Sequence, residues 1–243
     1  MNTLRVYVVG VFATLYQAGR VVLAAWRRSP HMACVCRSAP RRWASAILRA
    51  ARVQVELEGF EHLPEGTPAV LVANHESWFD VFALAAHLPV EYRFVAKKEL
   101  ASIPVFGSAW RACRHVSIDR SDRTAAIRSL EVARESVHAD GVVMVMFPEG
   151  TRSTTSEMLP FKKGAFVLAL QLGVPVIPVG ISGSRPIMPK GAIRVRPGTV
   201  KVRVGEPIPV EGMGERDRNR LLAQVRSAVE ELRGPSLDAK DGD

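Results

Sequence analysis

From residue 53 onward, short strand-like segments alternate with helix-like segments, and this order limits the chain to few architectures. We expect strands at 53–59, 68–74, 92–98, 115–119, 141–150, 174–181 and 200–208, and helices at 77–87, 103–113, 122–138, 164–172 and 213–233. Such alternation is typical of a largely parallel sheet with helices packed on it. The sequence therefore predicts one α/β domain over residues 53–233, with a mixed, largely parallel sheet flanked by helices. A polar tail at 234–243 is expected to be disordered.

The N-terminal segment differs sharply in charge. Its first 55 residues contain nine arginines and no acidic residue, which accounts for the whole net charge of +9 and leaves the remaining chain neutral. Residues 6–19 carry no charge, but as a helix they would reach only about 21 Å, short of a hydrocarbon core of about 30 Å. A full span would need the apolar run to continue to Trp26 with Arg20 snorkelling.

A second segment, 41–52, is amphipathic. Trp43, Ala46, Ile47 and Ala50 share one helical face, and Arg41, Arg42, Arg49 and Arg52 share the opposite face. A basic face opposite an apolar face with Trp is typical of a helix lying in an anionic lipid interface. We therefore expect residues 1–52 to be a membrane-associating helical hairpin, interfacial or half-inserted, joined by a linker-like stretch at 28–42. A transmembrane anchor, a cleaved signal peptide, a helix packed on the core and a nucleic-acid arm are the alternatives.

Nucleic acid is disfavoured as a partner because the basic residues lie among long aliphatic stretches, without a motif of stacking aromatics. The three cysteines, Cys34, Cys36 and Cys113, are few and odd in number and show no metal-binding spacing, which indicates a reduced compartment.

His75 and Asp80 follow the apolar run 68–74. On one regular helix, five residues would separate them by about 140°, so the side chains could not touch. His75 must therefore precede the helix, with Ser77 as its N-cap and Asp80 in the first turn, folding back towards the imidazole. A carboxylate bound to one ring nitrogen fixes the tautomer and leaves the other nitrogen as a base. Taken alone, the same residues also fit a capping box beside an ordinary loop histidine.

Residues 147–153, FPEGTRS, form the end of the most apolar predicted strand and the turn that follows it. A glycine turn lets the backbone approach an anion, and the guanidinium of Arg152 is suited to bidentate phosphate binding. Taken alone, the segment also fits a simple turn with a solvated arginine.

The motifs NHESWFD (74–80), AKKELASIPVFG (96–107), HVSIDR (115–120), FPEGTRS and GVPVIPVGI (173–181) occur in an order that resembles the 1-acylglycerol-3-phosphate acyltransferases, a family of glycerolipid acyltransferases. The resemblance covers about residues 70–182. It implies an enzyme that moves a fatty acyl group from acyl-CoA or acyl carrier protein to the sn-2 hydroxyl of 1-acylglycerol-3-phosphate, giving phosphatidic acid in phospholipid synthesis. No metal and no cofactor are implied.

The resemblance also assigns roles. It implies His75 as the base and Asp80 as the residue that orients it, because an alcohol needs a base near neutral pH and the reference pKa of imidazole is about 6.5. The acceptor's glycerol phosphate would be bound at the motif residues Lys97, Arg120, Gly150, Thr151 and Arg152, with Glu149 as a positioning residue. A structural ion pair with Asp119 or another carboxylate is the alternative for Arg120. Ser117 departs from the family, which usually has a larger apolar residue there, and this affects the expected shape of the acceptor pocket.

Three other functions are alternatives to this acyl transfer. Another lysolipid acceptor, such as a lyso-ornithine lipid, would use the same chemistry. A serine hydrolase would need the motif G-x-S-x-G, which GISGS (180–184) does not match. A non-catalytic membrane-binding module would not need both the His-Asp pair and the anion-binding turn. We therefore expect a monotopic enzyme at the cell membrane, on the cytoplasmic face by the tendency of basic residues to stay on that side.

Overall fold

A computed structural model of the chain describes residues 2–119, 124, 125, 128, 129, 131, 134, 137 and 141–235. Most of the helix predicted at 122–138, and the predicted tail from residue 236, lie outside the described residues.

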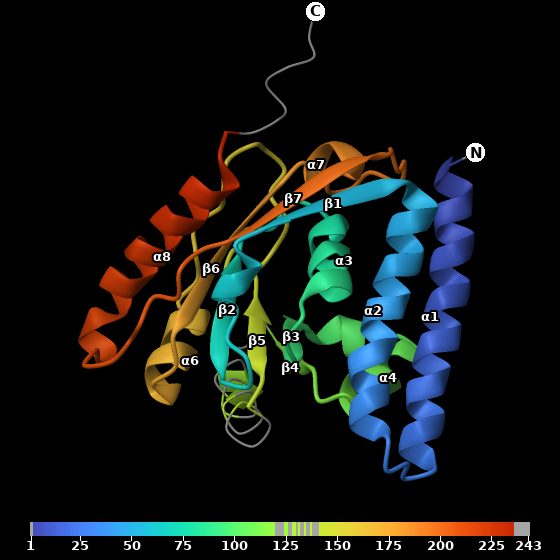
Figure 1. Cartoon of the computed structure of the whole chain (residues 1–243), viewed down its shortest axis with the longest axis horizontal. Helices are drawn as coiled ribbons and strands as arrows, with labels where there is room; N and C mark the ends of the chain where they lie inside the picture. Colours follow the sequence, from blue (N-terminus) through green and yellow to red (C-terminus); the bar gives the residue numbers. More distant parts are fainter. Residues whose placement is uncertain are drawn as a thin grey trace, which may run out of the picture.

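Within the described residues, seven strands form one sheet in the order β1-β7-β6-β2-β5-β3-β4 (Figure 1). The strands are β1 (Val53–Glu58), β2 (Ala69–Ala73), β3 (Tyr92–Lys97), β4 (Val116–Ile118), β5 (Val143–Met146), β6 (Val176–Ser182) and β7 (Gly198–Val204). The block β6-β2-β5-β3-β4 is parallel, β7 runs antiparallel to β6, and β1 is parallel to β7. The predicted mixed, largely parallel sheet is confirmed.

Helices cover both faces of this sheet. They are α1 (Asn2–Trp26), α2 (Met32–Ala51), α3 (Trp78–His87), α4 (Phe106–Ala112), α6 (Gly164–Leu172), α7 (Ser184–Ile187) and α8 (Arg218–Arg233). In Figure 1, α6 and α8 lie on one side of the sheet and α3 and α2 on the other, with α1 outside α2. The central strand β2 is buried on both faces, because Leu71 packs into one apolar cluster while Val70 and Val72 pack into the other.

Helix α1 is longer than the uncharged stretch at residues 6–19. α1 continues through Arg20, whose guanidinium donates a hydrogen bond to Gln17 Oε1 at 2.9 Å. Its 25 residues give a length of about 37 Å at ~1.5 Å per residue. Among the described helices, α1 alone is long and apolar enough to cross a membrane, by length and composition.

The prediction of a linker at 28–42 is wrong from Met32 onward, because α2 begins there and runs through Pro40. Most apolar residues in the second half of α2 face protein: Ala44, Ile47, Leu48 and Ala51 are buried, while Trp43 and Ala46 are partly buried. Leu48 is also buried, although it does not belong to the apolar face that the sequence pattern predicts. The alternative of a helix packed on the core therefore describes the second half of α2.

Cys36 of α2 and Cys113, which caps α4, form a disulfide, and Cys34 is free and exposed. The inference that all three thiols are reduced, drawn from their number and spacing, is therefore wrong for two of them. A pairing between residues so distant in sequence gives no local pattern.

The parallel strands bring the sequence motifs to one edge of the sheet. β2 leads into Asn74 and His75, β5 into Phe147 and the FPEGTRS turn, and β3 ends at Lys97. The carboxyl ends of parallel strands lie on the same side, which is where open α/β sheets bind ligands.

Candidate active site

His75 and Asp80 are in direct contact. The Nδ1 atom of His75 lies 2.9 Å from Oδ2 of Asp80. Asp80 is fully buried, and the same oxygen accepts hydrogen bonds from the backbone N–H groups of Glu76, at 2.7 Å, and Ser77, at 2.8 Å. Ser77 is the N-cap of α3, and its hydroxyl accepts a hydrogen bond from the Phe79 N–H. The capping box and the His-Asp pair predicted from the sequence are therefore both present.

This contact determines the tautomer of His75. A carboxylate only accepts hydrogen bonds, so Nδ1 carries the proton and Nε2 presents its lone pair. The ring is also stacked on Phe147, with centroids 4.2 Å apart and planes 22° apart. An imidazole held by a carboxylate and by an aromatic face has the orientation that a general base requires.

Glu149 connects the two motif loops. Its Oε1 accepts a hydrogen bond from the His75 backbone N–H at 2.7 Å, and its Oε2 accepts one from the Leu159 N–H at 2.9 Å. Burial raises the pKa of this carboxyl to about 7, although the two N–H groups lower it. With both oxygens engaged by backbone, Glu149 fixes the position of the loop that carries His75.

The turn after Glu149 brings a backbone segment and a cation together. Gly150 has φ of 73°, in the left-handed region, and a Cβ there would lie 2.9 Å from the Lys162 ammonium. Two residues later, the Arg152 guanidinium lies over the Trp78 ring, 5.1 Å from its centroid. Partial burial lowers the pKa of Arg152, while the carboxylate of Asp80 opposes that change. An arginine remains charged under such a shift.

A cavity of about 1230 Å³ opens at this site. Of the residues predicted for the site, His75, Lys97, Gly150, Thr151 and Arg152 line it, and Asp80 and Glu149 lie behind its wall. Lys97 is half-exposed, with its ammonium 4.0 Å from Glu99 Oε2. Arg120 lies outside the described residues.

The cavity extends from the sheet edge to the N-terminal helices. Val6, Gly10, Val11 and Leu15 of α1, and Pro40, Trp43 and Ile47 of α2, belong to its wall. Its lining is predominantly apolar, and its cationic residues are Lys97, Arg152 and Lys190. Such a combination of a long apolar space and a local anion site fits an amphiphilic ligand.

Comparison with known proteins identifies the chain's relatives. The family described as Acyltransferase matches residues 54–182. Human 1-acyl-sn-glycerol-3-phosphate acyltransferase alpha is 35% identical over 191 residues, which are 78% of this chain and 68% of the human protein. This chain belongs to the 1-acyl-sn-glycerol-3-phosphate acyltransferase family.

Two further relatives show how far the similarity extends. The crystal structure of PlsC from Thermotoga maritima, a 1-acyl-sn-glycerophosphate acyltransferase, covers 100% of this chain and 97% of its own, with a TM-score of 0.82 and 27% identity. The 1-acyl-sn-glycerol-3-phosphate acyltransferase of Cocos nucifera is 34% identical over 173 residues, 71% of this chain. The chain spans 56% of the coconut protein and 57% of a Chlamydomonas reinhardtii relative, somewhat more than half of each.

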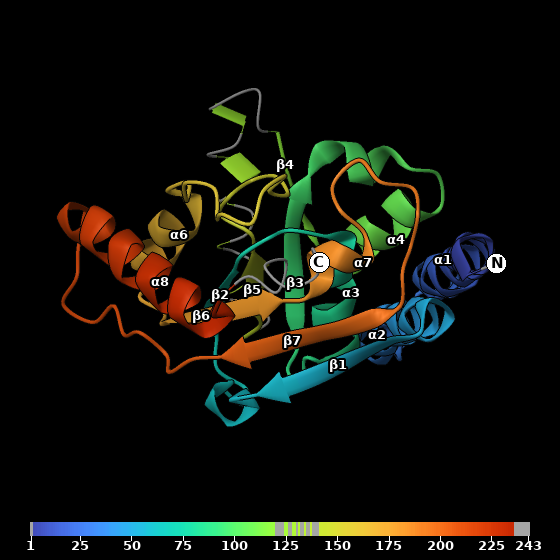
Figure 2. The same ribbon diagram turned by 90° about the horizontal axis from the view of Figure 1, so that it is seen from above.

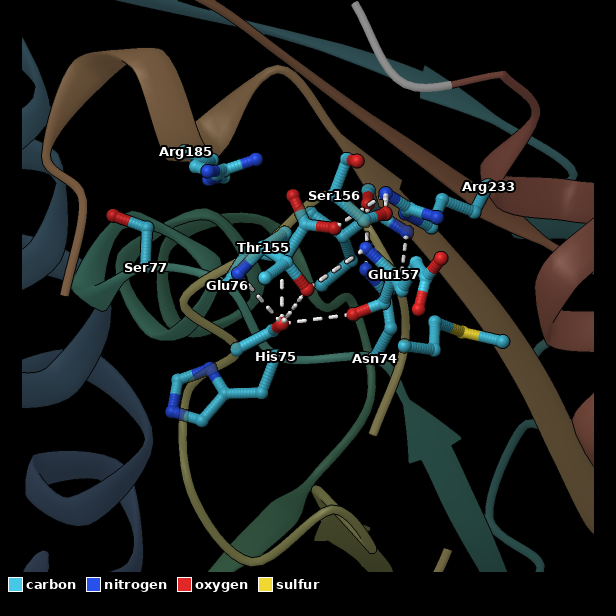
Figure 3. A network of polar contacts seen from close by, with 12 residues as sticks. Asn74, His75, Glu76, Ser77, Thr155, Ser156, Glu157, Arg185 and Arg233 are labelled. Atoms are coloured by element: carbon cyan, nitrogen blue, oxygen red, sulfur yellow. Dashed lines mark hydrogen bonds and ion pairs between the residues drawn. The ribbon is translucent and has the colours of Figure 1, made fainter. Parts of the chain in front are cut away.

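Several residues of this family member were not found by sequence reasoning. Glu76, next to His75, forms an ion pair with Arg233 at the end of α8, with Oε1 and Nη2 2.7 Å apart. Arg233 also donates a hydrogen bond to the Ser156 carbonyl in the loop after FPEGTRS. Figure 3 shows this network, with the His75 ring pointing away from it. Lys190 lines the cavity from the segment between α7 and β7.

Ser117, which departs from the family pattern, lies beside an aromatic wall. Its hydroxyl accepts a hydrogen bond from the Trp110 indole N–H at 3.1 Å, and Trp110 lines the cavity. His115 makes a structural contact, because its Nδ1 accepts the Phe94 N–H at 3.1 Å. Burial, reinforced by Arg93, lowers the pKa of His115 to about 3, so its ring is neutral.

Proposed function

We propose that the protein transfers a fatty acyl group from an acyl thioester, acyl-CoA or acyl carrier protein, to the sn-2 hydroxyl of 1-acylglycerol-3-phosphate, forming phosphatidic acid. The observation that carries this proposal is the His75 ring, held at Nδ1 by the buried Asp80, at the wall of a cavity that Arg152 also lines. Membership of the 1-acyl-sn-glycerol-3-phosphate acyltransferase family supports the same substrate.

The reaction uses His75 twice. Its Nε2 takes the proton of the acceptor hydroxyl while the oxygen attacks the thioester carbonyl carbon. The tetrahedral intermediate then collapses, the carbon–sulfur bond breaks, and the departing thiolate takes the proton back from His75. The carboxylate of Asp80 stabilises the imidazolium formed between these steps, and no covalent acyl-enzyme is required.

In the same proposal, Arg152 binds the acceptor phosphate, with Lys97, Thr151 and the backbone at Gly150 beside it. A guanidinium forms bidentate hydrogen bonds with phosphate, and the left-handed turn at Gly150 lets the backbone approach closely. Glu149 acts indirectly, since its carboxylate binds the His75 backbone. Arg120 keeps its proposed role at the phosphate from the family resemblance.

We further propose that residues 1–52 hold the protein at the cell membrane, on its cytoplasmic face. The outer side of α1 exposes Leu4, Val8, Phe12, Tyr16 and Trp26, while α1 and α2 together wall the cavity. A lysolipid can then pass from the bilayer to His75 with its chain in apolar surroundings. The basic residues at the turn between the helices, Arg27 and Arg28, favour the cytoplasmic side.

An acyl transfer assay tests the reaction. Purified full-length protein is given labelled acyl-CoA and, in separate reactions, 1-acylglycerol-3-phosphate, a lyso-ornithine lipid and a lysophosphatidylcholine. We expect the first acceptor to be used, and His75→Ala to lower kcat by about 10²–10⁴-fold. Preference for lyso-ornithine lipid would favour that alternative, and an unchanged rate in His75→Ala would remove the histidine from the mechanism.

A second variant tests the phosphate site. Arg152→Ala should raise KM for 1-acylglycerol-3-phosphate by roughly 10–100-fold, the equivalent of about 1.4–3 kcal/mol. Arg220→Ala, on the exposed side of α8 and paired with Asp217, is the matched control and should leave KM unchanged. Equal KM values for both variants would mean that Arg152 does not bind the phosphate.

A further inference from the structure

The segment that joins α7 to β7, residues 188–197, has an unusual surface. It exposes Ile193 to 79%, together with the cationic side chains of Lys190, Arg194 and Arg196. The chain contains no Asp or Glu between Glu157 and Glu206. Among the described residues, no ion pair joins these three cations to a carboxylate. We call residues 188–197 the α7–β7 segment.

On one side, the α7–β7 segment is fixed to the start of α1. The Thr3 hydroxyl accepts a hydrogen bond from the Val195 N–H at 3.1 Å and lies 3.3 Å from the Val195 carbonyl oxygen. The Tyr7 hydroxyl donates to the Ile193 carbonyl at 3.0 Å. The segment therefore runs beside the N-terminal end of α1, as Figures 1 and 2 show, and both Ile193 and Leu4 of α1 are exposed.

On its other side, the segment contacts the loops of the active site. The Ser77 hydroxyl donates a hydrogen bond to the Met188 carbonyl at 2.8 Å. Just before the segment, Arg185 donates to the Thr154 carbonyl at 3.0 Å, in the loop after FPEGTRS. Met188, Lys190 and Val195 line the cavity. The α7–β7 segment thus connects the exposed surface of α1 to the rim of the site.

We propose that the α7–β7 segment is a second lipid contact, in which Ile193 inserts at the boundary of head groups and acyl chains while Lys190, Arg194 and Arg196 bind the phosphates of anionic lipids. An interfacial element combines an apolar side chain with neighbouring cations in this way. An acidic protein, such as a carrier of the acyl donor, would need the cations but not an exposed isoleucine beside the N-terminal end of α1. The inference deepens the proposed membrane association and rests on it.

Depth-dependent quenching tests the contact directly. In full-length protein with Cys34→Ser, Ile193→Cys is labelled with an environment-sensitive fluorophore and mixed with phosphatidylcholine vesicles containing phosphatidylglycerol and a lipid-bound quencher. Glu211→Cys, in the exposed connection between β7 and α8, is the matched control. We expect a blue shift and quenching at position 193 only. A label at 193 that stays in water while one introduced by Phe12→Cys is quenched would overturn the proposal.

Kinetics on vesicles test the cations. Arg194→Gln combined with Arg196→Gln should raise the apparent KM for vesicle-borne lysolipid by about 30-fold, since each cation near an anionic surface contributes about 1 kcal/mol. Arg216→Gln with Arg220→Gln, at exposed positions just before α8 and in its first turn, should change nothing, and both pairs should match the wild type on detergent-solubilised substrate. Loss confined to carrier-protein donors, with vesicle binding intact, would mean a protein-docking surface and overturn the lipid contact. If the wild type transfers no acyl group in any format, the proposed function fails, but the quenching result still decides the contact.

Discussion

One oxygen atom of Asp80 contacts both the start of a helix and the ring of His75. Its Oδ2 accepts hydrogen bonds from the His75 ring and from two backbone N–H groups at the start of α3. The backbone bonds fix the carboxylate, and the fixed carboxylate orients the imidazole. The two interpretations of the sequence, a capping box or a base with its orienting acid, are therefore satisfied by the same geometry.

Replacing this carboxylate with an amide separates orientation from charge. In Asp80→Asn, the amide oxygen keeps the hydrogen bonds from the two backbone N–H groups and from Nδ1–H of His75, so the ring keeps its orientation but loses the negative charge that would stabilise its imidazolium. We expect kcat to fall by about 10²–10⁴-fold, with KM for both substrates changed little. Steady-state assays with acyl-CoA measure this, and thermal denaturation reports whether the variant remains folded. A folded variant with wild-type kcat would show that Asp80 only caps the helix.

Glu149 makes the stability of the loop depend on pH. Because burial raises its pKa from 4.5 to about 7, the unfolded chain releases this proton at a lower pH than the folded chain does. The contribution of Glu149 is therefore complete below pH about 4.5, falls as pH rises towards 7, and is lost above it. Its size is about 3 kcal/mol at most.

Comparison with Glu149→Gln isolates this effect. Denaturant unfolding of both proteins from pH 4 to 8 should show the stability of the wild type falling relative to the variant until pH is about 7, and then remaining constant. A difference that is constant over the whole range would mean that the folded carboxyl titrates at its ordinary pKa.

Local sequence predicted the parts of the site that local structure builds. His75 and Asp80 are five residues apart, and Gly150 and Arg152 share one turn, so spacing and turn rules predicted these local arrangements, while the site roles came from the family resemblance. The stacking of Phe147 on His75, the ion pair of Glu76 with Arg233 and the position of Lys190 depend on how distant elements meet. No periodicity or spacing in the sequence encodes these contacts.

At the scale of elements, α2 shows that an amphipathic pattern does not reveal whether its apolar face contacts protein or lipid. The pattern correctly predicts a helix and its apolar face, but a protein surface and a lipid interface bury the same kind of face. The structure places Ile47 and Leu48 against protein, and Arg41 donates a hydrogen bond to the Leu88 carbonyl. Arginines on such a helix can therefore bind the backbone of their own protein.

Helix α8 reaches the site through its last turn. Among the described residues, Arg233 is the only Lys or Arg side chain that is buried, and the carboxylates of Glu76, Asp80 and Glu149 are buried near it. Burying carboxylates is costly unless a cation and hydrogen bonds compensate. Arg233 thus provides the countercharge for the loop that carries His75.

Removing this countercharge should destabilise the protein strongly. Arg233→Met removes the Arg233 guanidinium from the buried Glu76 carboxylate, so we expect the free energy of unfolding to fall by about 3–5 kcal/mol. Adding Glu76→Gln should recover part of the loss, which denaturant unfolding of the single and double variants would measure as a coupling energy. Arg220→Met, exposed on the same helix, serves as the control with an effect within about 0.5 kcal/mol. Additive effects of the two substitutions would show that the pair is not coupled.

Over the whole molecule, the N-terminal helices and the α/β domain share one cavity. His75 and Asp80 come from the edge of the sheet, while α1 and α2 provide much of the opposite wall. The sequence predicted a membrane-associating segment and a catalytic domain as neighbours along the chain. It did not predict their shared wall, because the contacts of α1 with α2 and α4 join residues far apart in sequence.

The two sides of α1 should therefore respond differently to substitution. On the inner side of α1, Val21 is buried against protein. On the outer side, Phe12 is 69% exposed and does not line the cavity. Phe12→Asp therefore changes the outer surface alone. If this surface enters the bilayer, the substitution loses about 1.5–3 kcal/mol of apolar transfer, and vesicle partitioning should fall by roughly 10–100-fold. Transfer to detergent-solubilised acceptor should stay near the wild-type rate. Leu57→Asp, at a partly exposed position on β1, should partition normally in flotation with lipid vesicles. Equal partitioning of Phe12→Asp and the wild type would mean that the outer side of α1 does not contact lipid.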